Sequence, residues 1–339
     1  MRQGWRRGEA HLPSHRHPRT RTNFLNDPNV VTVNGGTLDL NDFSSQIGGL
    51  AGSGGTVLNN GGAASVFNVG IDDTNTVNTE YSGIIQNGSS NLSLTKRGAG
   101  TQTLSGVNTY TGPTTVSGGT LAINGSIVSP VTGEGGSIGG TGAISNTVTV
   151  LAGGSIAPGA PVGAFTVTGA INSSGTAFME IDRTNTPAIS DRLVGLSSVT
   201  LGGSLVVTNI GEALQAGDAF QLFLGAPLTL AFSNITLPGL GSGLAWSNSL
   251  SLNGSIAVVV STLNTTATNI TAKVSGANLE VSCPDDHTGW QLQVQTNSVS
   301  VGLGSNWVPW AGSVGTNQVF VPIDPANGAV FLRLVYPPQ

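Results

Sequence analysis

The stretch that decides the fold is "NTYTGPTTVSGGTLAINGS", which runs from Asn108 to Ser126. It contains no acid, no base, no histidine and no cysteine, so its regularity cannot serve acid–base or nucleophilic chemistry. The Gly-Gly corner allows positive φ, and a short alternating segment follows it. We predict two sets of side chains, inward ones at Val116, Leu121 and Ile123 and outward ones at Thr115, Thr120 and Ala122. Such a short segment is unstable alone and must stack on similar segments.

The same Gly-Gly doublet, followed by Thr or Ser and an apolar residue, recurs along the chain. Its six copies are Gly35 to Leu38, Gly54 to Val57, Gly118 to Leu121, Gly135 to Ile138, Gly153 to Ile156 and Gly202 to Leu205. The intervals between first glycines are 19, 64, 17, 18 and 49 residues. Three of these intervals, 19, 17 and 18 residues, are nearly equal and would correspond to one turn of a solenoid. We expect each longer interval to hold two or three such turns. This pattern predicts a parallel β-helix with loops of variable length.

Composition supports an all-β protein. The chain has 339 residues, of which only 9% are charged and 5% aromatic, while 50 are glycine. Disordered chains are usually charged and poor in branched apolar residues, whereas this one is rich in Val, Ile, Leu and Thr. Its one cysteine, Cys283, provides no disulfide framework, and no apolar run is long enough to predict a membrane span.

The amino-terminal segment 1–23 differs from the rest of the chain. It carries six Arg against one Glu, a charge of +5, whereas residues 24–339 carry −10. A basic arm can bind nucleic acid or an anionic surface, but the sharp compositional break at Asn23 favours a non-native or disordered segment. We therefore expect no nucleic-acid partner. No secretion signal is visible, because no apolar run follows the basic stretch.

The longer stretch "LTKRGAGTQTLSGVNTYTGPTTVSGGTLAINGS", from Leu94 to Ser126, resembles the autotransporter-associated β-strand repeat. It departs from the usual pattern at Pro113, where Gly is common, while Gln102 falls at a freely varying position. Proline lacks an amide donor, so we predict a corner at Gly112 and Pro113 rather than a ladder position. The resemblance implies a right-handed parallel β-helical passenger of environmental, Verrucomicrobia-like bacteria, located outside the cell or on its surface.

The carboxy-terminal part has a different pattern. We predict a β-helix over residues 24–260, a polar linker over 261–270 and a small antiparallel β-sandwich over 271–339. The sandwich is indicated by apolar residues that alternate along four runs, Leu279 to Cys283, Trp290 to Val294, Val319 to Ile323 and Val330 to Tyr336. This tail also resembles modules at the end of repeat proteins from Verrucomicrobia-like bacteria, in which "SWPADHTGW" is usual. Here Cys283 replaces the Trp and Asp285 the Ala.

We expect no translocator within this chain. A membrane barrel needs many strands of roughly ten residues, and only about 80 residues follow Ala257.

Three groups of polar residues are candidates for binding or chemistry. The first comprises Asp285, Asp286 and His287, the second Asp72, Asp73 and Glu80, and the third the Asn-Gly-Ser sites at Asn87, Asn124 and Asn253. The first group lies in a Pro-Asp-Asp turn, where Asp commonly bonds its own backbone. The second lacks the ligand spacing of a calcium loop. The third suits corners of a solenoid. We therefore expect no metal and no cofactor.

Three of the five tryptophans, Trp290, Trp307 and Trp310, lie within 21 positions. Trp290 alternates with Leu292, which predicts a core position. Trp307 and Trp310 flank Pro309 in a loop or edge strand, and two interpretations stay open. They either fill the core of a small domain or form an exposed platform for a glycan or another partner.

An enzyme is the main rival hypothesis. β-Helical enzymes that cleave acidic polysaccharides need acids and bases on corresponding positions of neighbouring turns. Between Phe24 and Ser261 the basic residues are only Lys96, Arg97, Arg183 and Arg192, and the acids are scattered apart from Asp72 with Asp73 and Glu180 with Asp182. No aligned set is visible, so we expect no enzyme.

The sequence favours a non-catalytic, secreted or cell-surface β-helical passenger with a structural or adhesive role. Its Thr, Ser and Asn face would contact extracellular glycans or cell-surface polymers. The alternative is glycan binding by the C-terminal module.

Overall fold

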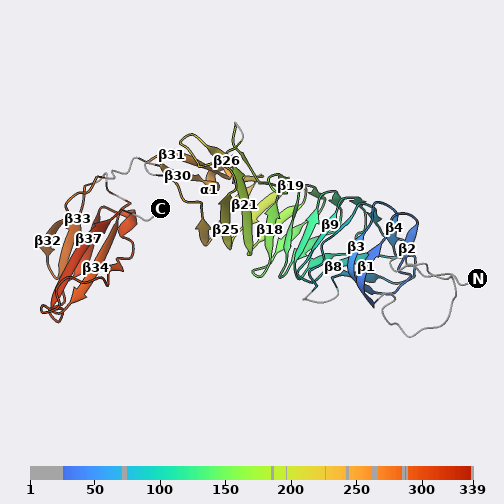
Figure 1. Ribbon diagram of the computed structural model, residues 1–339, viewed down its shortest axis with the longest axis horizontal. Coiled ribbons are helices and arrows are strands. Elements are labelled where there is room, and N and C mark those ends of the chain that lie inside the picture. Colours follow the sequence, from blue (N-terminus) through green and yellow to red (C-terminus); the bar gives the residue numbers. More distant parts are fainter. Residues whose placement is uncertain are drawn as a thin grey trace, which may run out of the picture. The chain divides into compact units, whose positions relative to one another are not determined.

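The computed structural model describes residues 26–70, 75–184, 187–195, 197–225, 227–241, 244–261, 266–284, 287 and 289–336. It is nearly all β, as predicted (Figure 1). The chain divides into two compact units. The first comprises Met1–Ala213, Asp218–Pro238 and Ser247–Ala257, and the second Leu214–Gly217, Gly239–Trp246 and Val258–Gln339.

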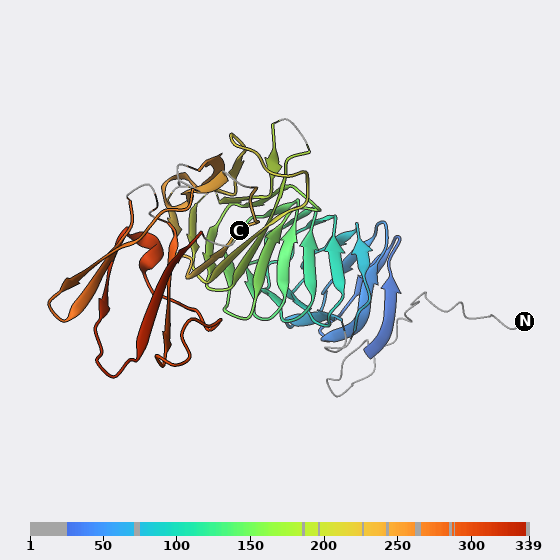
Figure 2. The same ribbon diagram turned by 60° about the vertical axis from the view of Figure 1, so that its left-hand side comes forward.

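The first unit is a parallel β-helix, which confirms the predicted fold (Figure 2). Its largest sheet has ten strands, in the order β1 (Asn26–Thr32), β3 (Ser45–Ala51), β5 (Ser65–Val69), β8 (Leu92–Lys96), β11 (Thr114–Val116), β14 (Val131–Gly133), β17 (Val148–Val150), β20 (Ala170–Ser173), β24 (Ser198–Leu201) and β28 (Leu228–Leu230). Neighbours in this order come from successive turns of the chain, and each pair is parallel.

Three further sheets complete the coil. A nine-stranded sheet contains β6 (Thr79–Tyr81), β9 (Thr101–Leu104), β12 (Thr120–Ile123), β15 (Ser137–Gly140), β18 (Ser155–Pro158), β21 (Thr176–Asp182), β25 (Ser204–Asn209) and β29 (Asn234–Thr236), with β22 (Ile189–Ser190) antiparallel to β21. A six-stranded sheet contains β10 (Val107–Asn108), β13 (Ser126–Ile127), β16 (Ala143–Ile144), β19 (Ala164–Val167), β23 (Arg192–Gly195) and β27 (Phe223–Leu224). The third is β2 (Thr37–Asp39), β4 (Thr56–Leu58) and β7 (Ile84–Ile85).

The Gly-Gly doublets mark the register of successive turns. Thr120 pairs with Ser137 and Ser137 with Ser155, steps of 17 and 18 residues. The 49-residue interval holds two steps, because Thr176 in β21 stands between Ser155 and Ser204. The 64-residue interval does not hold whole steps, contrary to our expectation. Its first doublet leads into β4 and its second into β12, which belong to different sheets.

The predicted alternation around the Gly-Gly corner is confirmed. Val116, Leu121 and Ile123 are fully buried, whereas the three intervening positions are half-buried on the outer surface. Gly119, the second glycine of the corner, has φ +58°, and a Cβ there would lie 2.3 Å from the carbonyl oxygen of Gly100 on the preceding turn. The corner therefore requires glycine for two reasons, its backbone conformation and its close approach to the preceding turn.

Pro113 lies at a corner, as predicted. It immediately precedes β11, so its missing amide falls outside the strand, while its carbonyl oxygen accepts a hydrogen bond from the Leu94 amide at 3.1 Å. Gln102, at a position where the repeat pattern sets no residue, has a structural role. It is buried, and its side chain accepts from the Leu50 amide at 3.0 Å and donates to the Leu50 carbonyl at 2.8 Å.

The interior also holds polar groups that the sequence pattern did not reveal. The fully buried side chain of Asn108 accepts a hydrogen bond from the Ile85 amide at 2.9 Å and donates to the carbonyls of Gly106 at 3.0 Å and Ser126 at 3.2 Å. One amide therefore ties three consecutive turns together. Nearby, the hydroxyl of buried Tyr110 bonds Thr114, which in turn bonds Ser129.

Beyond the parallel sheets, the chain forms a small antiparallel sheet and a short helix. Strand β26 (Ala219–Gln221) pairs antiparallel with β31 (Ser255–Val260), and β30 (Leu244–Ser249) follows β31 in the same sheet. Helix α1 (Leu250–Asn253) buries Leu250 and ends at Gly254, which is left-handed with φ 77°.

The second unit contains two three-stranded antiparallel sheets, in agreement with the predicted sandwich fold. One sheet has the order β32 (Thr271–Ser275), β33 (Asn278–Ser282), β36 (Gln318–Pro322), and the other β35 (Val308–Pro309), β34 (Gln291–Asn297), β37 (Ala329–Val335). Its core is formed by Val281, Leu292 and Val321, which come from both sheets. Leu279, Val319 and Leu332 of the apolar runs pack against this core, whereas Ile323 and Val330 at the ends of their runs are exposed.

We predict that Asn108→Ala destabilises the β-helix by about 2–4 kcal/mol, because it leaves the Ile85 amide and two carbonyls buried without partners. The matched control is Thr115→Ala, an outward position of the same repeat, which should cost no more than about 0.5 kcal/mol. Thermal unfolding followed by circular dichroism measures both. Equal losses in the two variants would contradict the structural role of the buried amide.

Candidate functional site

The most extended feature of the surface is a column of uncharged polar side chains on the ten-stranded sheet. Register pairing places one such residue from every strand in a single line, which runs Asn26, Gln46, Asn68, Thr95, Thr115, Thr132, Thr149, Asn172, Thr200 and Thr229. All ten are exposed or half-buried. We call this line the Thr/Asn ladder. Adjacent parallel strands lie about 4.8 Å apart, so the ladder presents hydroxyl and amide groups at a constant repeat.

A second column of polar side chains lies on the nine-stranded sheet. Four of its residues, Thr120, Ser137, Ser155 and Ser204, directly follow a Gly-Gly doublet. It comprises Thr101, Thr120, Ser137, Ser155, Thr176, Ser204 and Asn234. Neither column contains an ionisable group. The residues of these two columns therefore offer hydrogen bonds without fixed charge.

One basic residue of the solenoid is held entirely by structural contacts. Lys96 is buried, and its ammonium donates to the carbonyl oxygens of Arg97, Gly98 and Gly118, which uses all three donors. Burial lowers the pKa of Lys96 to about 8. Lys96 thus holds the corner at Arg97 and Gly98 to the corner of the next turn at Gly118.

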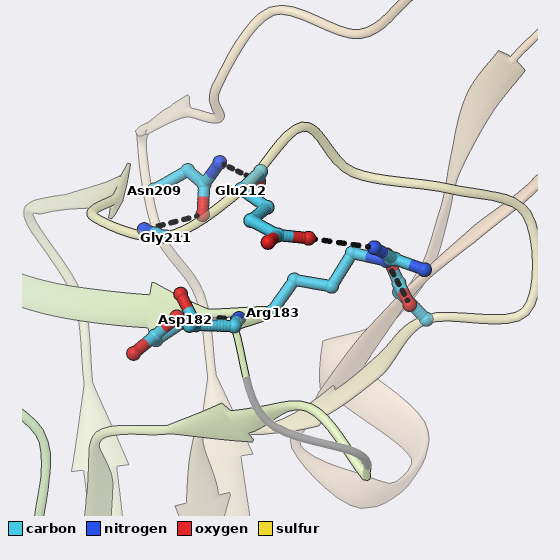
Figure 3. A network of polar contacts seen from close by, with 7 residues as sticks. Asp182, Arg183, Asn209, Gly211 and Glu212 are labelled. Carbon is cyan, nitrogen blue, oxygen red and sulfur yellow. Dashed lines mark hydrogen bonds and ion pairs between the residues drawn. The ribbon is translucent and has the colours of Figure 1, made fainter.

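Arg183 lies at the centre of a polar network near the end of β21 (Figure 3). Its guanidinium forms ion pairs with Asp218 at 2.9 Å and Glu212 at 3.5 Å. Asn209 supports the same loop, donating to the Glu212 carbonyl at 2.8 Å. Asp182 points away from this pair and accepts from the Thr184 amide at 2.7 Å; these local hydrogen bonds lower its pKa. The network thus holds a hairpin against the loop that follows β25.

Asp191 is the one described carboxyl whose pKa is strongly raised. It is almost fully buried, and burial raises its pKa to about 7, helped by the neighbouring Glu180 carboxylate and opposed by two amide donors. Those donors are the Gly163 amide at 2.9 Å and the Glu180 amide at 2.7 Å. Because both oxygens are occupied by backbone, Asp191 joins β21 to the start of β19 rather than facing an open site.

The three tryptophans of the C-terminal module occupy different environments. Trp290 is 7% exposed and packs on Tyr336 and His287, which confirms the predicted core position. Trp310 is half-buried against the hydrophobic core of the sandwich. Trp307 lies on the opposite side of the sheet, where the guanidinium carbon of Arg333 stands 4.3 Å from the centre of its ring.

The structure therefore does not bring Trp307 and Trp310 together. They are three positions apart in an extended segment, so their side chains point to opposite faces. Of the two, only Trp307 lies on the outer face of the sheet.

The other candidate residues do not assemble into a site in the described part of the chain. His287 is buried and its Nε2 lies 2.8 Å from the Thr266 carbonyl oxygen. Asp72, Asp73, Asp285 and Asp286 lie outside the described residues. Glu80 accepts a hydrogen bond from Ser105 at 2.6 Å. Among the residues that the structure describes, no three His, Cys, Asp or Glu side chains are grouped as metal ligands.

The Asn-Gly-Ser residues behave as corner residues. The side-chain oxygen of Asn87 accepts from the amides of Leu92 and Thr111, that of Asn124 from Thr141, and that of Asn253 from Ser255. These bonds hold turns within the solenoid.

Comparison with known proteins identifies one repeat. Residues 94–123 match the family described as the passenger-associated-transport-repeat, in agreement with the resemblance seen in the sequence. The match covers β9, β10, β11 and β12. It indicates a passenger-type protein, and such a repeat suggests secretion or display on the cell surface. No curated protein matches the chain. Within the described residues, no helix is long and apolar enough to cross a membrane.

We predict that the β-helix loses stability as the pH rises from about 4 to 7. The native state keeps the Asp191 proton up to about pH 7, whereas the unfolded chain releases it near the ordinary value of 3.8, so the stabilisation is full at low pH and gone above pH 7. Asp191→Asn should flatten this part of the profile of unfolding temperature against pH. Asp182→Asn, an exposed control, should leave it in place; identical profiles for wild type and Asp191→Asn would contradict the assignment.

We also predict that the two tryptophans differ in their effect on stability. Trp310→Ala should destabilise the C-terminal module by about 2–4 kcal/mol, because it removes a ring packed on the core. Trp307→Ala should cost about 1 kcal/mol or less, the value of an exposed cation–π contact. Unfolding monitored by intrinsic tryptophan fluorescence measures both, and equal losses of stability would contradict the inner and outer placement.

Proposed function

We propose that this protein is a secreted or cell-surface, non-catalytic passenger-type β-helix with a structural or adhesive role. The observation that carries the proposal is the Thr/Asn ladder, which continues without interruption over all ten strands of one sheet. The passenger-associated repeat supports an extracellular setting.

The mechanism is interfacial. Each ladder residue contributes one weak hydrogen-bonding group, and the register of the β-helix repeats that group from turn to turn. A rigid column of weak sites can bind a repetitive polymer through many simultaneous contacts, because further contacts form as intramolecular events. Neutral hydroxyl and amide groups match extracellular glycans or cell-surface polymers that carry many hydroxyls.

The absence of catalysis is part of the proposal. Lys96 is fully engaged with carbonyls and Arg183 with two carboxylates, so neither is placed to abstract a proton or stabilise a developing charge. Turnover of a uronate polymer that is lost when one acidic residue of the solenoid is changed would contradict this part.

A second candidate function is glycan binding by the C-terminal module. It is favoured by Trp307, a half-buried indole on the outer face of the β35–β34–β37 sheet. Aromatic rings on a rigid sheet are suited to contact sugar rings, since they combine an apolar face with little loss of side-chain entropy. Trp310 takes no part in this candidate, because it packs inward.

We predict that the full chain is retained on insoluble neutral polysaccharides, cellulose or chitin particles, and that Thr115→Glu weakens retention about tenfold. The new carboxylate would lie in the middle of the ladder and would have to be desolvated on contact. The matched control is Val107→Glu, which adds the same charge at a position 63% exposed on the six-stranded sheet. Pull-down isotherms measure the three proteins. Failure of the wild type to bind, or equal loss in both variants, would contradict adhesion through the ladder.

A further inference from the structure

The outer face of the β35–β34–β37 sheet carries an arginine that is held in position without an acidic partner. Arg333 lies on β37 directly opposite Gln293 on β34. Its Nε and Nη2 donate to the side-chain oxygen of Gln293 at 2.9 and 2.7 Å, and its guanidinium carbon lies over the Trp307 ring. These contacts fix the plane of the group while the side chain stays exposed.

One edge of this guanidinium is available for a ligand. Arginine has five N–H donors, and the two hydrogen bonds to Gln293 use those on the Nε side. The edge formed by Nη1 and Nη2 keeps two parallel N–H groups. That geometry fits a carboxylate, which accepts both in a bidentate contact.

Arg333 lacks the acidic neighbour that two other basic residues of the chain have. Arg183 pairs with Asp218 and Glu212, and Lys273 stands opposite Glu280 on the neighbouring strand. Within the part of the chain that the structure describes, no salt bridge joins Arg333 to a carboxylate. The guanidinium therefore presents a net positive charge that is already oriented.

The surroundings of Arg333 are polar and preorganised. The outward positions of β34 are all amides, Gln291, Gln293, Gln295 and Asn297. Buried Gln295 accepts from the Gly304 amide at 2.8 Å and donates to Asn306 at 2.5 Å, so it pins the loop that leads to Trp307. An acidic peptide would need only the charge, whereas this face adds an indole for a sugar ring.

We propose that this outer face binds a glycan that contains uronic acids, with Arg333 receiving the carboxylate and Trp307 contacting the sugar ring. The proposal rests on the second candidate function and specifies its ligand class. No bond is made or broken in the contact. It is independent of the Thr/Asn ladder, which lies on the other unit of the chain.

The test uses the full chain and polygalacturonate as the probe, with calorimetric titration at low ionic strength. We expect Arg333→Gln to weaken binding about tenfold or more, because it removes both donors and the charge. Arg333→Lys keeps the charge but lacks the two parallel N–H donors of the guanidinium, so its loss of affinity should be intermediate. Lys273→Gln removes the same charge from the other sheet and should leave affinity within about twofold, since an exposed charge paired across strands contributes little. Unfolding temperatures verify that each variant is folded.

Three outcomes would overturn the proposal. The wild type does not bind polygalacturonate, Arg333→Gln and Lys273→Gln weaken binding equally, or polyglutamate binds as tightly as polygalacturonate and so identifies an acidic peptide instead. A neutral glucan that binds in a Trp307-dependent way, without polygalacturonate binding, would leave the second candidate function standing and reject only the uronate ligand.

Discussion

Each turn of the β-helix depends on backbone hydrogen bonds that it cannot make with itself. Strand β11 has three residues and β10 has two, and their amides and carbonyls are satisfied only by the turns before and after. The amide of Thr120 donates to the carbonyl of Gly100, and that of Ser137 donates to Gly119. One register therefore sets both the buried aliphatic column and the outward ladders, since alternate residues of the same short strand supply them.

The buried polar side chains protect that register. A stack of short strands loses its register when one strand slips by a residue, which turns the buried side chains of that strand outward. Asn108 prevents this because its donors and acceptors are matched to three specific turns, and a shifted stack would leave them unpaired. Lys96 has the same effect at a corner.

Much of the fold could be predicted because its determinants are local. Alternation around the Gly-Gly corner predicted the burial of Val116, Leu121 and Ile123, and the missing amide of Pro113 predicted its corner. The burial of Gln102 could not be found in this way, since its partner Leu50 is 52 residues away. Arg333 and Trp307 likewise meet only through the pairing of β34 with its neighbours. The opposite faces of Trp307 and Trp310 were available from their odd spacing in an extended segment.

The variable length of the turns has a consequence for how such a chain can change. Successive partners in the second column are as few as 17 residues apart, between Thr120 and Ser137, and as many as 30, between Ser204 and Asn234, yet the column remains continuous. The additional residues leave the sheet at corners, as the hairpin between β21 and β23 does. A corner can thus acquire an insertion without displacing a single outward hydroxyl, so loops can diversify while the repeating face is inherited intact.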